Sequence, residues 1–304
     1  MTNNYFIADV FTRQPFNGAQ IAVFPHAENL DDRQMQILAR ELNLSETVFV
    51  QPSTEQKNHR RIRIFSPTKE INFGGHPIIA TTFVLAKSGE LDLTQQHTTL
   101  TLEQNTGPID STITVREGSP HFVQFTQQVE STIDRFAPTT QELSELLSIP
   151  PEAIDDRTFG VRLVSAGFPY LIVPVFNYET VRQARFNYAA WAQSTAPQTA
   201  AQEILLFSGR NPHGDANFNA RLLGPNIGVQ DDPPVGSSMP AFAAYLASHE
   251  HIQQGTHSFA VDRGDDQSRR SVLNLEMDNL GKAQLTIRVG GEAVLVAQGQ
   301  IETP

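Results

Sequence analysis

Two nearly uncharged stretches of this sequence resemble each other, and each begins on a glycine. They are Gly75-His76-Pro77-Ile78-Ile79-Ala80-Thr81-Thr82-Phe83-Val84-Leu85-Ala86 and Gly236-Ser237-Ser238-Met239-Pro240-Ala241-Phe242-Ala243-Ala244-Tyr245-Leu246-Ala247. Both carry alanine at the sixth position and end on Leu-Ala, and their glycines lie 161 residues apart. A helix that is apolar all round is normally buried. The repeat therefore predicts two buried central helices and an internal duplication of the chain.

Short runs rich in β-branched and aromatic residues fill most of the remaining sequence, and Gly, Pro, Asn or Asp bound them. Such runs predict strands. The predicted strands cover 5–10, 21–24, 47–50, 61–65, 98–102, 113–116, 121–125, 162–165, 170–175, 203–208, 258–261, 273–277, 285–289 and 293–296. Further helices are predicted from a cap at Asp32, from Thr140 and over 186–192. The pattern predicts an α+β protein of two similar domains, residues 1–128 and 129–304, and leaves open whether the last strand returns to the first domain.

The glycine-rich starts of the two central helices suggest where a ligand binds. If each half wraps a curved sheet around its helix, the two helix starts can face each other across a domain cleft. Free N–H groups and the positive end of the helix dipole bind anions such as carboxylates. Pockets for small molecules also tend to lie between domains. We therefore expect a carboxylate ligand at this place.

Composition excludes several classes of function. The 304 residues carry 22 basic and 33 acidic side chains, a net charge of −11, so phosphate backbones and anionic lipid surfaces are poor partners. There is no cysteine, which excludes thiolate metal sites and the cofactor-free racemases that use two cysteines. The first residues show no secretory signal, and no apolar run approaches the ~20 residues that span a bilayer. We expect a cytoplasmic protein.

Glu46 is the first candidate for proton chemistry. In the segment Asn43-Leu44-Ser45-Glu46-Thr47-Val48-Phe49-Val50, strand alternation places Glu46 on one face with Val48 and Val50. A carboxylate on an apolar face loses solvation, so its pKa rises and it becomes suited to general acid and base work near neutral pH. The alternative is a glutamate at the start of a strand that reaches solvent.

His76 and Asp232 are the other two candidates. His76 follows Gly74-Gly75 in the first turn of a predicted helix, where the dipole disfavours the imidazolium and a neutral ring can pass a proton. The alternative is a histidine that only packs or caps there. In Asp231-Asp232-Pro233-Pro234-Val235-Gly236-Ser237, Asp232 can orient a partner or take a proton, and Gly236 and Ser237 offer donors to an anion. The alternative is an acidic turn that caps a helix.

Other motifs point away from nucleotides and metals. The sequence contains no Gly-x-Gly-x-x-Gly, phosphate-binding loop, His-Glu-x-x-His or Gly-x-Ser-x-Gly. His249-Glu250-His251 is the nearest approach to a metal cluster, but side chains at i and i+2 on a helix diverge. We interpret that triplet as solvated surface and expect no metal and no cofactor.

Several motifs together resemble the phenazine-biosynthesis PhzF-like isomerase family, in the family's order and over nearly the whole chain. They are Asp9-Val10-Phe11, Phe16-Asn17-Gly18, Leu44-Ser45-Glu46-Thr47-Val48-Phe49, Arg63-Ile64-Phe65-Ser66-Pro67, Gly74-Gly75-His76-Pro77, Asp231-Asp232-Pro233, Gly236-Ser237 and Val289-Gly290-Gly291.

The resemblance implies a fold similar to diaminopimelate epimerase and usually a homodimer. It also implies a cofactor-independent isomerase in which Glu46 moves a proton within a small carboxylated substrate, similar to dihydro-hydroxyanthranilate isomerase. His76 and Asp232 match polar residues around the substrate, and Ser45, Gly75, Gly236 and Ser237 match substrate-binding positions.

Differences from the family pattern leave the substrate open. The sequence has Ala19-Gln20 where Asn-Pro is common, and Pro234-Val235 where Ala-Thr is usual. Two other functions remain under consideration: a non-catalytic module that binds a small ligand or a protein, and an epimerase or racemase without cysteine. The latter needs a second base opposite Glu46, for which Asp232 and His76 are the candidates.

Overall fold

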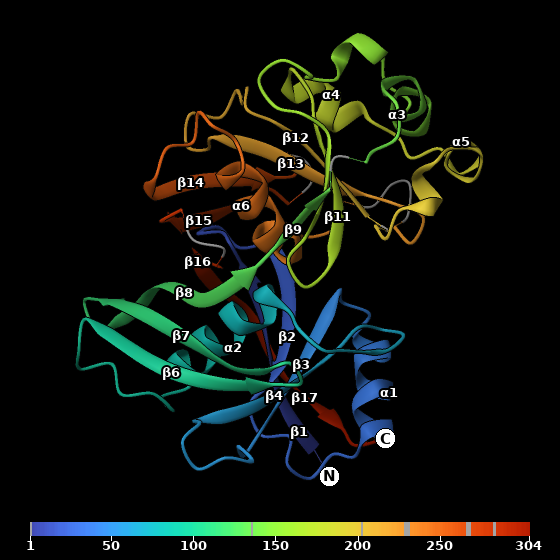
Figure 1. Ribbon diagram of the computed structural model, residues 1–304. Coiled ribbons are helices and arrows are strands. Elements are labelled where there is room, and N and C mark those ends of the chain that lie inside the picture. The colour runs from blue at the N-terminus through green and yellow to red at the C-terminus, as the bar shows by residue number, and fades with distance from the viewer. Residues whose placement is uncertain (1, 135, 202, 228–231, 266–268, 282–283) are drawn as a thin grey trace. The chain divides into compact units, whose positions relative to one another are not determined.

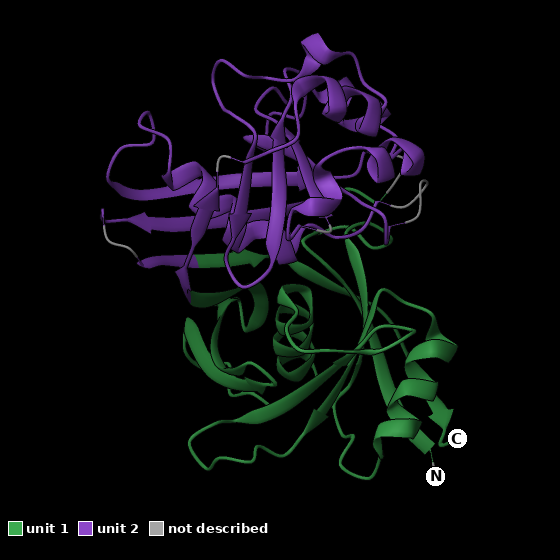
Figure 2. Cartoon of the chain, turned by 45° about the vertical axis from the view of Figure 1, so that its right-hand side comes forward, with its two compact units in different colours: residues 1–127, 269–271, 288–304 green, residues 128–268, 272–287 purple. Residues whose placement is uncertain are grey.

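The computed structural model describes residues 2–134, 136–201, 203–227, 232–265, 269–281 and 284–304. The chain forms two compact units (Figure 2). Unit 1 comprises residues 1–127, 269–271 and 288–304, and unit 2 comprises residues 128–268 and 272–287. The carboxyl-terminal residues 288–304 thus belong to the same unit as the amino terminus. No helix in the described ranges is long and apolar enough to cross a membrane.

Unit 1 contains a curved sheet that is mostly antiparallel. Its strands are β1 (Thr2–Val10), β2 (Ala19–Phe24), β3 (Glu46–Gln51), β4 (Arg60–Phe65), β5 (Glu70–Ile71), β6 (His97–Gln104), β7 (Gly107–Arg116), β8 (Ser119–Glu130) and β17 (Ala293–Glu302), with β8 continuing into unit 2. Strands β17, β1, β2, β3, β4, β6, β7 and β8 pair in that order, and only the β2–β3 and β4–β6 pairs are parallel.

Two helices lie on opposite sides of this sheet (Figure 1). Helix α2 (Gly75–Lys87) lies inside the curve, and every residue over 75–86 is buried, as its uncharged sequence predicts. Helix α1 (Asp32–Leu42) is amphipathic and packs Met35 and Leu38 against phenylalanines of β2, β3 and β4. Its cap is Asp31, which accepts the Gln34 N–H at 2.8 Å, so the predicted cap at Asp32 was one residue late.

Unit 2 contains a second sheet with more helices. Its strands are β9 (Thr132–Asp134), β10 (Arg162–Ser165), β11 (Pro169–Pro174), β12 (Glu203–Ser208), β13 (Phe218–Leu223), β14 (Gly255–Arg263), β15 (Ser271–Asn279) and β16 (Gln284–Gly291), the last two reaching into unit 1. Its helices are α3 (Thr140–Leu147), α4 (Tyr178–Gln183), α5 (Tyr188–Gln193) and α6 (Met239–Ala247), with short 3₁₀ turns at Pro151–Ala153, Ala196–Gln198 and Gly236–Ser238. Helices α3, α4 and α5 gather on one side of the unit (Figure 1).

The two units repeat one pattern of strand pairing. In unit 1 the pairs β1–β2, β2–β3, β3–β4 and β4–β6 are antiparallel, parallel, antiparallel and parallel. In unit 2 the pairs β10–β11, β11–β12, β12–β13 and β13–β14 follow the same sequence. The buried helix, α2 or α6, comes between the last two strands in both units. This common order supports an internal duplication.

Glu103, in β6, fixes the loop between β3 and β4. Its carboxylate accepts hydrogen bonds from Ser53 Oγ at 2.9 Å, from the Thr54 N–H at 3.1 Å and from Arg61 Nη1 at 2.8 Å. Hydrogen bonds from the threonine and serine are the main reason why the pKa of Glu103 falls to about 2. A lowered pKa means that Glu103 stabilises the fold above its unfolded pKa, and that this contribution is lost as the pH falls toward 2.

We therefore expect Glu103→Gln to lower the free energy of unfolding at pH 7 by about 1–3 kcal/mol. The N–H₂ group of the glutamine would replace one carboxylate oxygen and would point at donors that it cannot accept from. The difference from the wild type should shrink as the pH falls below about 4.5. Urea unfolding at several pH values measures it. Glu55→Gln is the matched control, because Glu55 lies in the same loop and its carboxylate pairs with exposed Lys57. Equal losses in the two variants would contradict this role of Glu103.

Candidate active site

Glu46 is the first residue of β3, and its side chain lies on the α2 side of the sheet. Phe49 belongs to the apolar cluster around α1. Because alternate residues of a strand face opposite ways, Glu46, Val48 and Val50 face α2. Oε2 of Glu46 is shielded from solvent and has no hydrogen-bond partner within the described part of the chain. Burial raises the pKa of Glu46 to about 7. This carboxyl group can therefore both take and return a proton near neutral pH.

The strand register brings Glu46 toward the start of α2. Val48 pairs with Ile64 of β4, so Glu46, two residues along β3, lies diagonally opposite Ile64 on the same face. Such diagonal neighbours are about 7–8 Å apart. The Cδ1 atom of Ile64 lies 3.4 Å from the place a Cβ atom would take on Gly74, the residue that precedes α2. Ile64 is therefore a neighbour of Gly74 and a diagonal neighbour of Glu46.

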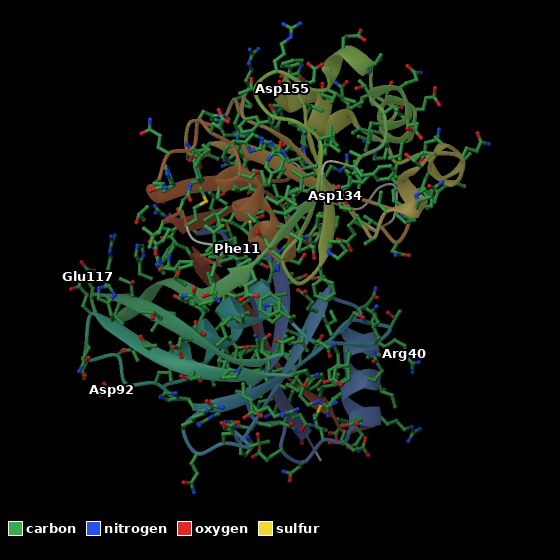
Figure 3. All side chains as sticks on the ribbon, viewed as in Figure 1. Phe11, Arg40, Asp92, Glu117, Asp134 and Asp155 are labelled. Atoms are coloured by element: carbon green, nitrogen blue, oxygen red, sulfur yellow. The ribbon has the colours of Figure 1, made fainter. Side chains whose placement is uncertain are left out.

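His76 lies in the first turn of α2 and is 3% exposed. Its ring meets the edge of the Phe11 ring, with 5.1 Å between the centroids. Phe11, labelled in Figure 3, directly follows β1 in a left-handed backbone conformation, with φ of 62°. A Cβ atom on Gly291 would collide with the Phe11 ring. Gly291 is therefore required by packing, since a side chain there would displace the aromatic ring that packs against His76.

The loop after β1 is fixed by a buried ion pair that the sequence analysis did not predict. Asp9 is fully buried, accepts the Phe16 N–H at 2.6 Å and pairs with Arg269 Nη2 at 2.5 Å. Burial raises the pKa of Asp9, and the Arg269 charge partly opposes that rise. Arg269 also donates to the carbonyl oxygens of Asn17 and Gly18. Asp9 and Arg269 thus hold the Phe16-Asn17-Gly18 motif in place.

Asp232, in unit 2, is ion-paired. Arg182 Nη1 of α4 donates to Oδ2 at 2.6 Å, and Arg263 Nε of β14 lies 3.6 Å from Oδ1. All three side chains are largely buried. The two guanidinium groups hold the Asp232 carboxylate in place, so its geometry suits it to orienting its partners. Asp231 lies outside the described residues.

The second glycine motif begins a short 3₁₀ turn, Gly236–Ser238, that leads into α6. Gly236 is buried and Ser237 is half-buried, with a hydrogen bond to the side chain of Tyr170 in β11. Burial is the main reason why the pKa of Tyr170 is raised. The hydroxyl group of Ser238 turns back to the Val235 carbonyl oxygen at 2.7 Å. The hydroxyl group of Ser238 is thus engaged within the motif, and that of Ser237 with Tyr170.

The remaining predicted residues fall into different surroundings. Ser45 is exposed, and Gly75 is buried at the first position of α2. The interpretation of His249-Glu250-His251 as solvated surface was wrong for His249, which is 7% exposed and packs against Tyr245 and Phe159. No group of three metal-binding side chains occurs among the residues that the structure describes.

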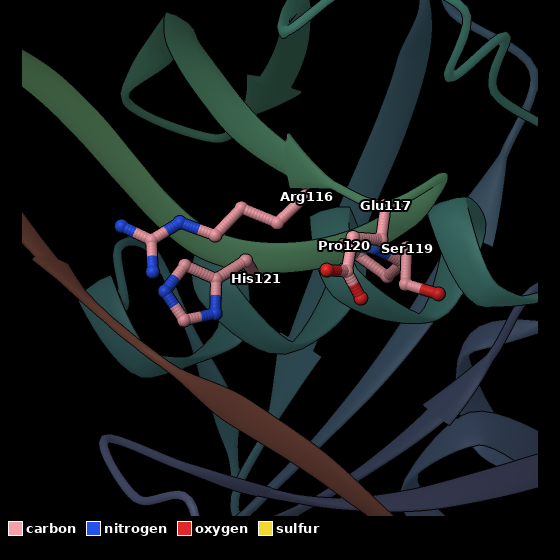
Figure 4. Close-up of a pocket in the computed structure, with 5 residues that line it drawn as sticks. All are labelled: Arg116, Glu117, Ser119, Pro120 and His121. Atoms are coloured by element: carbon pink, nitrogen blue, oxygen red, sulfur yellow. The ribbon is translucent and has the colours of Figure 1, made fainter.

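An open hollow of about 540 Å³ lies at the turn between β7 and β8 (Figure 4). Arg116, Glu117, Ser119, Pro120 and His121 line it. Glu117 and Gly118 both have positive φ values, which is typical of a two-residue hairpin turn. None of the predicted site residues lines this hollow, so it is separate from the site around Glu46.

Comparison with known proteins gives a consistent picture. The family model described as phenazine biosynthesis-like protein matches residues 8–299. An uncharacterized isomerase of Mesorhizobium japonicum is 31% identical over 302 residues, 99% of each chain. A trans-2,3-dihydro-3-hydroxyanthranilate isomerase of Pseudomonas aeruginosa is 26% identical over 98% of this chain and 99% of its own.

A solved structure confirms the expected fold class. The crystal structure of a PhzF-family phenazine biosynthesis protein from Bacillus anthracis matches 99% of both chains with a TM-score of 0.85 at 22% identity. The α+β fold similar to diaminopimelate epimerase, with a sheet around a central helix, is therefore confirmed.

Proposed function

Because the chain belongs to the family of phenazine biosynthesis-like proteins and is an isomerase, we propose that it moves a proton within a small carboxylated substrate without a cofactor. Glu46 is the general base and then the general acid. The observation that carries this proposal is the buried Oε2 atom of Glu46, which has no partner among the described residues and whose carboxyl group has a pKa of about 7.

The proposed reaction needs one proton and no oxidant. The carboxylate of Glu46 takes a proton from one carbon of the substrate, and the electron pair of that C–H bond passes into the conjugated system. The neutral acid then returns a proton to a different carbon, so the double bonds move and the composition is unchanged. A positioned acid–base group of this kind typically contributes about 10²–10⁴-fold to the rate.

The other candidate residues take supporting roles in this proposal. His76 faces the substrate from the first turn of α2, and Gly75 and Ser45 bind it with backbone or hydroxyl groups. Asp232, Gly236 and Ser237 match substrate-binding positions by the family resemblance, and within unit 2 Asp232 is held by its arginine partners. The proposal extends to a homodimer, on the strength of the family resemblance.

Exchange of substrate hydrogen with solvent tests the proposal. The protein is incubated with trans-2,3-dihydro-3-hydroxyanthranilate in D₂O, and deuterium at carbon is followed by NMR. Because only ionised Glu46 can take a proton, the exchange rate should rise with pH through about 7 and then level off. An epimerase would incorporate deuterium with inversion and no shift of double bonds. A protein that only binds the acid would show no exchange, and that result would refute the proposal.

A further inference from the structure

Gln104 ends β6 and supplies the cap that α2 lacks. Gly74, the residue before α2, has no side chain, and a Cβ atom there would lie 2.7 Å from Cγ of Pro77. A capping serine or aspartate at this position is therefore excluded by packing. Instead, Oε1 of Gln104, at the end of β6, accepts a hydrogen bond from the Gly74 N–H at 3.3 Å.

The other end of the same amide group is a buried donor without an acceptor. Gln104 is 3% exposed, and its Nε2 atom has no hydrogen-bond partner within the described ranges. Its orientation is fixed by chemistry, because only the carbonyl oxygen can accept the Gly74 N–H. A buried donor left unpaired costs about 1–3 kcal/mol. Such groups are rare in folded proteins, and each one calls for an explanation.

Gln104 bonds to the Gly74 N–H directly, and Ile64, which lies beside the same glycine, is a diagonal neighbour of Glu46 across the β3–β4 pair. Nε2 of Gln104 is a donor, and Oε2 of Glu46 belongs to the proton-transferring carboxyl group. An anion at the start of α2 would have the helix N–H groups and this amide as donors.

Resting on the function proposed above, we propose that Nε2 of Gln104 donates a hydrogen bond to a carboxylate oxygen of the substrate at the start of α2. Gln104 is then a substrate-binding residue that joins the helix cap to the ligand. A carboxylate is the acceptor that fits, because the helix start and the amide both present N–H groups and neither presents an acceptor.

Two variants of Gln104 distinguish the role of its Oε1 atom, which accepts from Gly74, from that of its Nε2 donor. Gln104→Glu retains Oε1 for the Gly74 N–H but replaces the N–H₂ group by a second carboxylate oxygen. It should raise the KM for trans-2,3-dihydro-3-hydroxyanthranilate about 10- to 100-fold, the effect of one lost charge-assisted hydrogen bond, with little change in kcat. Gln104→Met removes both groups and adds no charge, and it should raise KM as well. Gln51→Glu is the control, because Gln51 Nε2 donates to the Ala27 carbonyl oxygen at 3.3 Å.

The outcomes distinguish this inference from the proposed function. A wild-type protein without turnover or hydrogen exchange is not an isomerase of this acid, and calorimetric binding of anthranilate, a stable carboxylate probe, then tests Gln104 alone. An active wild type with an unchanged KM in Gln104→Glu overturns the role of Gln104 and leaves the function standing. If Gln104→Glu does not fold, an unchanged KM in Gln104→Met overturns it equally. A KM rise in Gln51→Glu as large as in Gln104→Glu would mean a general structural effect and would also overturn it.

Discussion

The Glu46→Gln variant is expected to lose about 10²–10⁴-fold in kcat, with little change in affinity for the substrate. Glutamine keeps the size and the hydrogen-bonding reach of glutamate but has no oxygen that can take and return a proton. The same group acts in both half-reactions, so the loss appears in the chemical steps. Deuterium exchange at carbon and steady-state isomerisation of trans-2,3-dihydro-3-hydroxyanthranilate measure it.

Glu41→Gln is the matched control for this experiment. Glu41 is an exposed glutamate of α1, five residues earlier in the chain, and its change should leave kcat and exchange at wild-type values. Exchange near the wild-type rate in Glu46→Gln would show that Glu46 is not the base. The proton would then have to be taken by His76 or Asp232.

Stability provides a second readout of the same carboxyl group. The pKa of Glu46 is raised from 4.5 to about 7, so the fold favours the neutral acid. A raised pKa gives stability that is present below about 4.5 and is lost as the pH rises through about 7. Glu46→Gln cannot ionise, so it should exceed the wild type at pH 8–9 by up to about 3 kcal/mol and approach it at pH 4. Urea unfolding at the two pH values tests this difference.

The buried helices could be predicted from the sequence because their physics is local. An uncharged run of about a dozen residues after a glycine has no polar face to expose, and α2 and α6 are both buried. The start of the second helix is less regular than expected, because Gly236–Ser238 forms a 3₁₀ turn and the α-helix begins at Met239. All fourteen predicted strands occur.

Strands β5, β9 and β13 were not predicted from the sequence, and β13 shows where local patterns fail. Strand β13 reads Phe-Asn-Ala-Arg-Leu-Leu, and its asparagine and arginine look like surface residues. Both are buried, because Asn219 donates to Asp262 of β14 at 2.5 Å and Arg221 donates to carbonyl oxygens at the end of α4. These partners lie 37–43 residues away, so no short window of sequence contains the pairing.

The residues of the site also differ in whether nearby or distant sequence determines their role. Strand alternation made Glu46 one candidate beside a glutamate that reaches solvent, and the family resemblance then selected it; its Oε2 atom is shielded from solvent. Arg269 was not predicted, because it pairs with Asp9 across 260 residues. Gln104 was not predicted either. Its role depends on a hydrogen bond to the backbone of Gly74, which lies 30 residues earlier in the chain. The sequence did contain one signal for such a residue. The two glycines before His76 leave the start of the helix without a capping side chain, so a polar group from elsewhere in the chain has to supply it.

His76→Ala is expected to lower kcat/KM by about 10²–10³-fold, the effect typical of removing one donor or acid–base group from an active site. The change removes a ring that is 3% exposed and that packs edge-on against Phe11. Because the ring both positions the substrate and assists proton movement in our proposal, KM should rise and kcat should fall together. The packing loss should cost about 0.5–3 kcal/mol of stability.

The control for His76 must separate chemistry from packing. His59→Ala removes an exposed histidine of the same unit, whose Nδ1 accepts the Thr101 N–H at 2.9 Å, and should leave kcat/KM unchanged. His76→Phe keeps an aromatic ring against Phe11 but has no ring nitrogen, so it should be as inactive as His76→Ala while losing less stability. If His76→Phe retained wild-type kcat/KM, the ring would serve packing alone, and Glu46 would act without help from the first turn of α2. If both variants were inactive but folded, the nitrogens of His76 would be required for the chemistry, and packing against Phe11 would serve to hold them in place.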